Sequence, residues 1–400
     1  MRDSCWEMSY PGCVPGGRGP RARTDGTGGD GYNDGGATSG GLAHGGQATI
    51  FANGGSILVE AGNTVTLSAA TQGGEAYGGN GGDALAIQGS ESTGAKGYVE
   101  VGASGDGDVT LGGSLNLYAN SLGGRSDADA GDAIGGTARI WNSGSGTVQV
   151  AGGTLAEAGA QIQGSYGEGQ ESGTGGDATG GQLEVQASNT GTITLAAYTG
   201  FAYGDGGSRY SSSGDAGFGM GGKVNVSAAD SATVSFSSLY ADAAGKGGDH
   251  DGGTGGAGQG GDIAIGDGSG SLTVGSLTAG ASGRGGRGAL MGGKGTGGTS
   301  LLGIYHDGGT AQIASATLIA DGIGGNAGYQ SFSNGAATAT GGEGVGGLAG
   351  FEAFGVGTNI TVSSSASASA SGIGGAGFNG GAGRGGMPPG LNDNPQNLDP

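Results

Sequence analysis

A Gly-Gly pair followed by a short alternating apolar run recurs along this 400-residue chain, and it constrains the fold more than any other feature. The clearest copies begin at Gly45-Gly46, Gly135-Gly136, Gly180-Gly181, Gly221-Gly222 and Gly260-Gly261. From Gly135 onward the clear copies are spaced by roughly 39 to 45 residues, and a weaker copy at Tyr98-Val99-Glu100-Val101 lies between the first two. Spacings of this size are in the range of internal periods that indicates a repeat array. We therefore expect stacked copies of one structural unit.

A second alternating run follows each first run at a nearly constant distance. Examples are Val148-Gln149-Val150, Ile193-Thr194-Leu195 and Val234-Ser235-Phe236, and a third short run such as Leu277-Thr278-Ala279 often follows. An apolar residue at every second position is typical of a strand with one buried face, and no segment carries a 3.6-residue period with caps. Three short strands per repeat predict one coil of a parallel β-helix.

Stacked coils would place Ile, Val and Leu in inward ladders, with Thr, Ser, Asn and Gln outward. We expect Tyr198, Tyr203 and Tyr240 to point outward as well. Glycine, which supplies 109 residues, is expected at coil corners and in long loops on one side of the array. Collagen is excluded, because there is no Gly-X-Y period and the chain has only seven prolines.

The domain organisation follows from where the repeats begin and end. We predict an all-β parallel β-helix (solenoid) of about eight irregular repeats over residues 41–372, with long Gly-rich loops. Residues 1–40 form a Gly/Pro-rich N-terminal segment and residues 373–400 a tail rich in Gly, Pro and Asn. Both ends are expected to be disordered.

The charge of the chain excludes several kinds of partner. It has 34 acidic and 14 basic residues, a formal net charge of −20. Nucleic acid and anionic lipid surfaces are therefore not expected partners, whereas weak binding of divalent cations is compatible with this charge. No stretch approaches 18 apolar residues, so no transmembrane helix is expected. The first residues lack the apolar segment of a signal peptide, which suggests a fragment of a longer protein.

Possible metal ligands lie in glycine-rich segments. Residues 78–86 match the calcium-binding nonapeptide of RTX proteins at every position, but only once, whereas that chemistry needs tandem copies. We favour a solvated loop and keep Asp83, Asp249 and Asp251 as weak calcium candidates. His44, His250 and His306 are each expected on exposed loops.

No catalytic constellation is predicted, and no cofactor other than possible calcium. Residues 217–223 and 288–294 have the spacing of a phosphate-binding loop, but Val224 and Gly295 stand where Ser or Thr is needed. A glycosidase would need paired, rigidly held carboxylates. Acids such as Asp106, Asp108, Asp127, Asp129 and Asp132 lie in glycine-rich segments, so we do not expect an enzyme.

The residue pattern of the repeat resembles that of a known group of proteins. Gly54-Gly55-Ser56-Ile57-Leu58-Val59 and Gly112-Gly113-Ser114-Leu115-Asn116-Leu117-Tyr118-Ala119 are similar to repeats of glycine-rich β-strand exoproteins of Gram-negative bacteria, related to filamentous haemagglutinins and autotransporter passengers. The resemblance covers roughly residues 41–372. It implies a right-handed parallel β-helix, exported to the outer-membrane surface or secreted. The secretion-directing domain and membrane barrel of that group are missing here. Glycine-rich mycobacterial surface proteins are a second resemblance, through residues 374–377 and 380–383, but their N-terminal helical domain is missing.

Three functional hypotheses follow, and the resemblance implies the first of them. The first is a non-catalytic structural or adhesive stalk that mediates attachment or aggregation, with host cells, glycans, other surface ligands or its own copies as partners. The second is a calcium-binding, RTX-like secreted β-roll. A polysaccharide-degrading β-helix enzyme is the third and least favoured.

Overall fold

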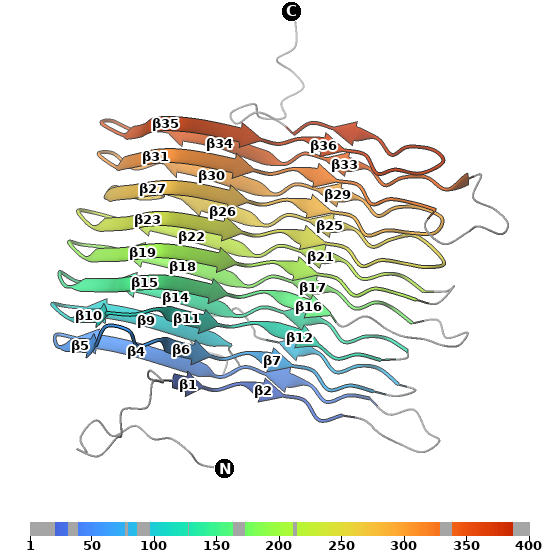
Figure 1. The fold of residues 1–400 in the computed structure, drawn as a ribbon, viewed down its shortest axis with the longest axis horizontal. Helices are drawn as coiled ribbons and strands as arrows, with labels where there is room; N and C mark the ends of the chain where they lie inside the picture. Colours follow the sequence, from blue (N-terminus) through green and yellow to red (C-terminus); the bar gives the residue numbers. More distant parts are fainter. Residues whose placement is uncertain are drawn as a thin grey trace, which may run out of the picture.

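The computed structural model describes residues 21–30, 39–76, 79–85, 97–126, 128–162, 173–210, 214–328 and 338–386. Over these residues the chain forms strands arranged in four sheets, and every pairing between strands is parallel. Each coil passes once through all four sheets before the next coil begins. The coils stack from the N-terminal coil at the bottom of Figure 1 to the C-terminal coil at the top. The predicted parallel β-helix is confirmed.

Two sheets carry the longer strands, on the left of Figure 1. Sheet I contains β4 (Gln47–Asn53), β9 (Tyr98–Ser104), β14 (Thr137–Asn142), β18 (Gln182–Ala187), β22 (Lys223–Ala228), β26 (Asp262–Ile265), β30 (Thr299–Ile304) and β34 (Leu348–Ala353). Sheet II contains β1 (Arg21–Arg23), β5 (Ser56–Val59), β6 (Val65–Ser68), β10 (Asp108–Leu111), β11 (Leu115–Tyr118), β15 (Thr147–Glu157), β19 (Thr192–Phe201), β23 (Thr233–Asp242), β27 (Ser271–Gly280), β31 (Thr310–Ile319) and β35 (Asn359–Ser369). The eight strands of sheet I match the predicted number of repeats.

The other two sheets consist of very short strands, on the right of Figure 1. Sheet III contains β2 (Gly26–Thr27), β7 (Thr71–Gln72), β12 (Ser121–Gly123), β16 (Ala160–Ile162), β20 (Gly204–Asp205), β24 (Gly245–Lys246), β28 (Gly283–Arg284), β32 (Gly322–Ile323) and β36 (Gly372–Ile373). Sheet IV contains β3 (Ala43–His44), β8 (Ala84–Leu85), β13 (Ala133–Ile134), β17 (Ala178–Thr179), β21 (Gly219–Met220), β25 (Gly258–Gln259), β29 (Gly295–Thr296), β33 (Gly344–Val345) and β37 (Gly383–Arg384).

The core lies between sheets I and II and tapers toward the short sheets. Apolar side chains fill its wide part as ladders, for example Ile140, Val185, Val226 and Ile265 in successive strands of sheet I. Where sheet II ends, the ladder changes to alanine: Ala69, Ala119, Ala158, Ala202, Ala243, Ala281 and Ala320, all fully buried. Beyond the alanines the inward positions of sheets III and IV are mostly glycine. Side-chain volume therefore decreases along each coil, and the two layers converge.

From β20 and β21 onward, glycine is required where sheets III and IV meet, because a Cβ there would overlap the backbone of the opposite sheet. In the earlier coils, small side chains and Ile162 pack between these sheets, in a cluster that includes Ala133, Ala160 and Ala178. A Cβ on Gly245 of β24 would overlap the carbonyl oxygen of Gln259 in β25. Packed sheets are ordinarily about 10 Å apart, separated by two layers of side chains. In these later coils the two backbones are in direct contact, and this contact explains much of the glycine in the chain.

Hydrogen bonds cross this glycine layer and climb the stack. Gly248 donates to the carbonyl of Gly217 (2.9 Å), Gly256 to that of Gly248 (2.8 Å) and Gly286 to that of Gly256 (2.8 Å). Each bond joins one short sheet to the other, alternately within a coil and between neighbouring coils. The backbone groups of the glycine segments are thus satisfied inside the body. The glycine-rich segments, which we expected to form long loops, in large part form sheets III and IV, the second half of every coil.

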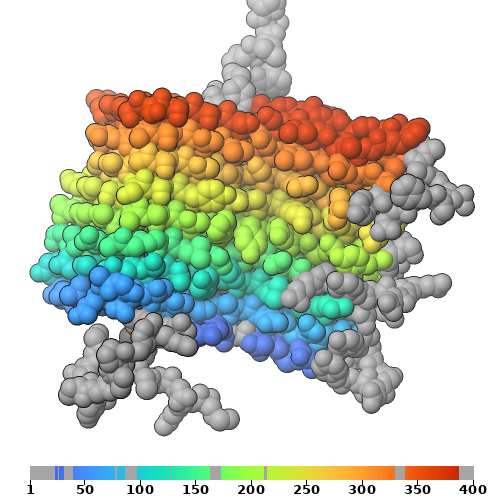
Figure 2. All heavy atoms as spheres, in the orientation of Figure 1, coloured from blue at the N-terminus to red at the C-terminus, as the bar shows by residue number. Residues whose placement is uncertain are grey.

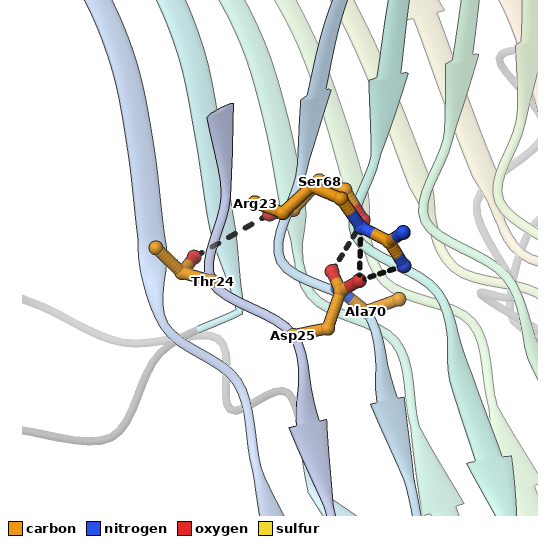
Figure 3. Close-up of polar contacts among 5 residues, drawn as sticks. All are labelled: Arg23, Thr24, Asp25, Ser68 and Ala70. Carbon is orange, nitrogen blue, oxygen red and sulfur yellow. Dashed lines mark hydrogen bonds and ion pairs between the residues drawn. The ribbon is translucent and has the colours of Figure 1, made fainter. Parts of the chain in front are cut away.

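Aspartate and asparagine side chains tie each coil to the next at the bends. Asp25 Oδ1 accepts the N–H of Ala70 (3.1 Å) and the Ser68 hydroxyl, while Arg23 pairs with its other oxygen (Figure 3). In each case the acceptor bonds the residue at the equivalent position of the following coil. The same bond is made by Asp30, Asp83, Asp108, Asn120, Asp129, Asp132, Asp177, Asp249, Asp307, Asp321 and Asn326. Much of the acidity of the chain therefore has a structural cause.

Three expectations differ from the structure. The second and third predicted strands are fused into one long strand from β15 onward. Tyr198 is buried, with 2% of its surface exposed, because β19 turns two successive residues, Ala196 and Ala197, away from the core and thereby reverses the alternation. Strands β1, β2 and β37 lie beyond the predicted boundaries 41–372, so the array is longer than predicted on both sides.

The body is a slab and not a thin rod. It is wider along the strands than it is tall along the stack (Figures 1 and 2). The nine stacked strands of sheets III and IV, at about 4.8 Å per step, give a height of about 40 Å. Its broad outer faces belong to the rigid sheets.

Candidate binding surface on the outer face of sheet I

The outward side chains of sheet I form a grid, because parallel strands in register bring equivalent positions together. One row runs Phe51, Gly102, Trp141, Gln186 and Ser227, and the row beside it runs Thr49, Glu100, Arg139, Glu184 and Asn225. These side chains are fixed by the strand ladder and do not depend on loop conformation. This is the kind of support that a preorganised binding site needs.

An aromatic platform, defined by Phe51 and Trp141, lies at the N-terminal end of this grid. The two rings are stacked with centroids 5.3 Å apart and an interplanar angle of 25°. They belong to strands that are two coils apart, and the residue between them is Gly102. A Cβ on Gly102 would overlap Cε2 and Nε1 of Trp141 and lie 2.9 Å from Cδ2. The indole therefore lies flat across the strand below it only because that position is glycine.

Charged and polar groups hold the platform in place. Glu100 Oε2 accepts hydrogen bonds from Trp141 Nε1 and from the Tyr98 hydroxyl, both 2.9 Å long. The guanidinium of Arg139 lies 5.2 Å from the centroid of the indole ring, a cation–π contact. Arg139 also pairs with Glu184 (3.2 Å) and donates to Gln186 Oε1 (3.0 Å). Every polar group around the indole thus has a defined orientation.

Burial shifts the pKa values of this cluster. Desolvation, assisted by the neighbouring Glu100 carboxylate, raises the pKa of Tyr98 to about 12, so the phenol stays protonated and continues to donate. Desolvation also raises the pKa of Glu184, and the charge of Arg139 opposes that shift. The platform therefore holds two carboxyl groups, Glu100 and Glu184, on either side of one guanidinium.

Further exposed aromatic pairs lie elsewhere on the slab. Tyr305 and Phe354 stack at 5.9 Å near the C-terminal coils, and Tyr305 donates to Glu352 (2.6 Å). Phe201 and Tyr240 meet at 5.8 Å on sheet II, with Tyr240 outward as predicted. Neither pair is surrounded by the number of fixed polar groups that surround Trp141.

The sequence did not single out this platform. Phe51, Glu100, Arg139 and Trp141 lie in three successive repeats, whose register partners are 51 and 39 residues apart. Only the alternation, which places them on the outward face of their strands, carried a signal.

Two of the three calcium candidates, Asp83 and Asp249, are already engaged in side-chain contacts. Asp83 Oδ1 accepts the N–H of Asp132, and Asp249 accepts the N–H of Arg287 and pairs with its guanidinium at 2.7 Å. Although burial alone would raise the pKa of Asp249, these bonds to Arg287 lower it. Asp251 lies near Asp249 on the chain, and two residues of the nonapeptide, Gly78 and Ala86, lie outside the described residues. In the described part of the chain, no group of three or more His, Cys, Asp or Glu residues could hold a metal.

Two residues expected on unsupported loops are held firmly. His250 is buried, with 3% of its surface exposed, so the expectation of an exposed loop histidine is wrong. Its Nε2 lies 2.8 Å from the carbonyl oxygen of Gly214, and its Nδ1 accepts the N–H of Gly252. Asp108 begins β10, and hydrogen bonds from the hydroxyl and N–H of Thr147 lower its pKa. Both residues contribute to contacts between coils.

No family model matches this chain, and neither the curated proteins nor the solved structures contain a match. Among the residues that the structure describes, none form a helix that is long and apolar enough to cross a membrane.

Proposed function

We propose that this chain is a non-catalytic structural and adhesive part of a secreted or cell-surface exoprotein, and that it mediates attachment or aggregation. The observation that carries this proposal is the aromatic platform on the outer face of sheet I. It is a fixed, partly exposed surface on a rigid slab, and residues that are fixed by a scaffold make better binding sites than loop residues.

The distribution of polar chemistry supports a binding role. Aspartates at the bends are used in bonds between coils, and the glycines are used in contacts between sheets III and IV. The groups that remain on the outer face of sheet I are aromatic, amide and paired charged side chains. Such groups suit the recognition of a surface by many weak contacts.

Adhesion can be measured with beads that carry the purified protein. We expect these beads to aggregate, or to attach to epithelial cells and to polysaccharide-coated glass under flow, more than beads that carry serum albumin. Attachment equal to that of albumin on every surface, together with no aggregation, would overturn the proposal.

Catalysis and calcium binding are tested on the same preparation. The two carboxyl groups beside Arg139 are the feature that most resembles a glycosidase, so a panel of polysaccharides is incubated with the protein and reducing ends are counted. We expect none to be released; release that disappears in Glu100→Gln would show an enzyme. We also expect the circular dichroism spectrum to be the same with calcium and with EDTA, and β-structure that forms only with calcium would favour the β-roll.

A further inference from the structure

The geometry points to the aromatic platform as a binding subsite for a neutral polysaccharide, in which a pyranose ring packs against Trp141 and Phe51 and its hydroxyls bond Glu100 and Arg139. This inference rests on the proposed adhesive function and names the ligand class of that surface. The argument concerns three properties of the platform: its shape, its polar rim and its charge.

The shape of the platform suits a flat ligand. The Phe51 and Trp141 rings are stacked with their planes 25° from parallel, Phe51 has 43% of its surface exposed, and Trp141 is half-buried. Strand β9 lies between the two strands that carry these rings, so the platform runs along the stacking axis. A linear polymer laid along that axis would pass from Phe51 to Trp141 and then to Gln186, the next residue of the same row.

The mixture of apolar and polar groups favours a sugar over a protein partner. A stable protein interface needs on the order of 1,000 Å² with an apolar centre. Here two rings stand among polar neighbours, Thr49, Glu100 and Gln186, in the adjacent positions of the grid. A pyranose has the matching pattern, with an apolar C–H face for the rings and a rim of hydroxyls for carboxylate, guanidinium and amide groups.

The charges of the platform and of the chain disfavour an anionic ligand. Glu184 pairs with Arg139, so these two charges offset each other, while Glu100 accepts from the neutral donors Trp141 and Tyr98 and keeps its negative charge. Arg139 is the cation that contacts Trp141, and it stands between two carboxylates, Glu100 and Glu184. A polyanion would meet this arrangement on a chain with a net charge of −20, which repels it.

Glycine at position 102 provides a direct test of the platform. Gly102→Ala keeps every side chain of the cluster but forces the indole to move, because the new Cβ would overlap the ring. Gly159→Ala is the matched control: its Cβ would lie 2.6 Å from Cζ of Tyr203 and displaces that ring, which does not belong to the platform. In both variants the atoms displaced are the far ends of side chains, so we expect the fold to persist.

The experiment uses tryptophan fluorescence in a Trp6→Phe background, where Trp141 is the remaining indole. Cellohexaose, xylohexaose and the hexamer of N-acetylglucosamine are the neutral probes, and polygalacturonate is the anionic probe. We expect a saturable change in Trp141 emission with at least one neutral probe. Calorimetry should show binding that is weaker by about tenfold or more in Trp141→Ala and in Gly102→Ala, the loss produced by about 1.4 kcal/mol of stacking, and unchanged binding in Gly159→Ala.

Each other outcome counts against the subsite. The inference is overturned if no neutral probe binds, if polygalacturonate binds more tightly than all of them, or if Gly102→Ala and Gly159→Ala bind equally well. The bead assay separates this failure from that of the proposed function. Attachment that persists in Gly102→Ala, without oligosaccharide binding, would refute the subsite and leave adhesion standing. Oligosaccharide binding without any attachment would do the reverse.

Discussion

The glycine layer between sheets III and IV makes a quantitative prediction about Gly248, near the middle of the stack. In Gly248→Ala the new Cβ would overlap the carbonyl oxygen of Gly207 and lie 3.0 Å from the amide nitrogen of Ser208, both in the preceding coil. These are backbone atoms held by their own hydrogen bonds, so they cannot move aside as a side chain would. The coils must separate locally.

The cost follows from the contacts that this separation breaks. Two hydrogen bonds across the layer depend on the position of Gly248, its N–H to Gly217 and its carbonyl to Gly256. Their loss, at about 0.5–1.5 kcal/mol each, adds to about 1–3 kcal/mol for overpacking. We therefore expect the variant to lose about 2–6 kcal/mol of stability.

Gly153→Ala is the matched control, because nothing lies within 4 Å of a Cβ at that exposed position of β15. Restricting the unfolded chain should leave this variant as stable as the parent, or up to about 1 kcal/mol more stable. Unfolding in guanidinium chloride, followed by far-UV circular dichroism, compares the two midpoints. A Gly248→Ala midpoint at or above that of Gly153→Ala would refute the close backbone contact between successive coils at this position.

Other contacts give further predictions. Desolvation and the neighbouring charges of Asp177 and Asp83 raise the pKa of Asp132, so its ionised form weakens the folded state at neutral pH and this penalty is relieved as the pH falls through the raised pKa. Asp132→Asn keeps an acceptor for the N–H of Asp177. We expect this variant to raise the free energy of unfolding, measured in urea, by less than about 1 kcal/mol at pH 7, but not at pH 3. A lower free energy of unfolding at pH 7 would contradict the repulsion. Thr154 is buried, and within the described residues its Oγ1 has no hydrogen-bond partner, so Thr154→Val should raise stability by about 1 kcal/mol; a loss would reveal a partner for that hydroxyl. Asp25→Ala removes the acceptor shown in Figure 3, and hydrogen exchange over residues 21–27 should become faster while Asp25→Asn stays close to the parent; equal exchange in both variants would show that this bond does not hold the first coil.

The fold was largely predictable because the signals that define it are local. The alternation of apolar residues in β14, β18 and β22, repeated after a constant Gly-Gly pair, is enough to predict stacked parallel strands with inward ladders. The same rule was wrong for Tyr198, because β19 reverses its alternation at Ala196 and Ala197, as β23, β27 and β31 do at the equivalent positions. That reversal is a bend in the backbone, and the two alanines do not predict it.

The roles of glycine and aspartate were not predictable, because both depend on residues from other parts of the chain. Gly245 must be glycine on account of Gln259, and Asp83 is fixed by an N–H of the next coil. A glycine next to a glycine reads equally well as a loop. The platform was not predictable from the sequence for the same reason, since Phe51 and Trp141 meet only when β9 lies between their strands with glycine at position 102.

The sequence by itself determined the architecture of this protein: all-β, parallel and repeating, with about eight coils. This is because the alternating residues of a strand show which of its faces is buried, and the spacing of the runs gives the period of the repeat. The tertiary structure alone decided the rest, namely that the layers converge on glycine, that the carboxylates bridge coils, and that an indole lies flat beside Glu100 and Arg139. Those properties arise from distances between coils, which no single repeat contains.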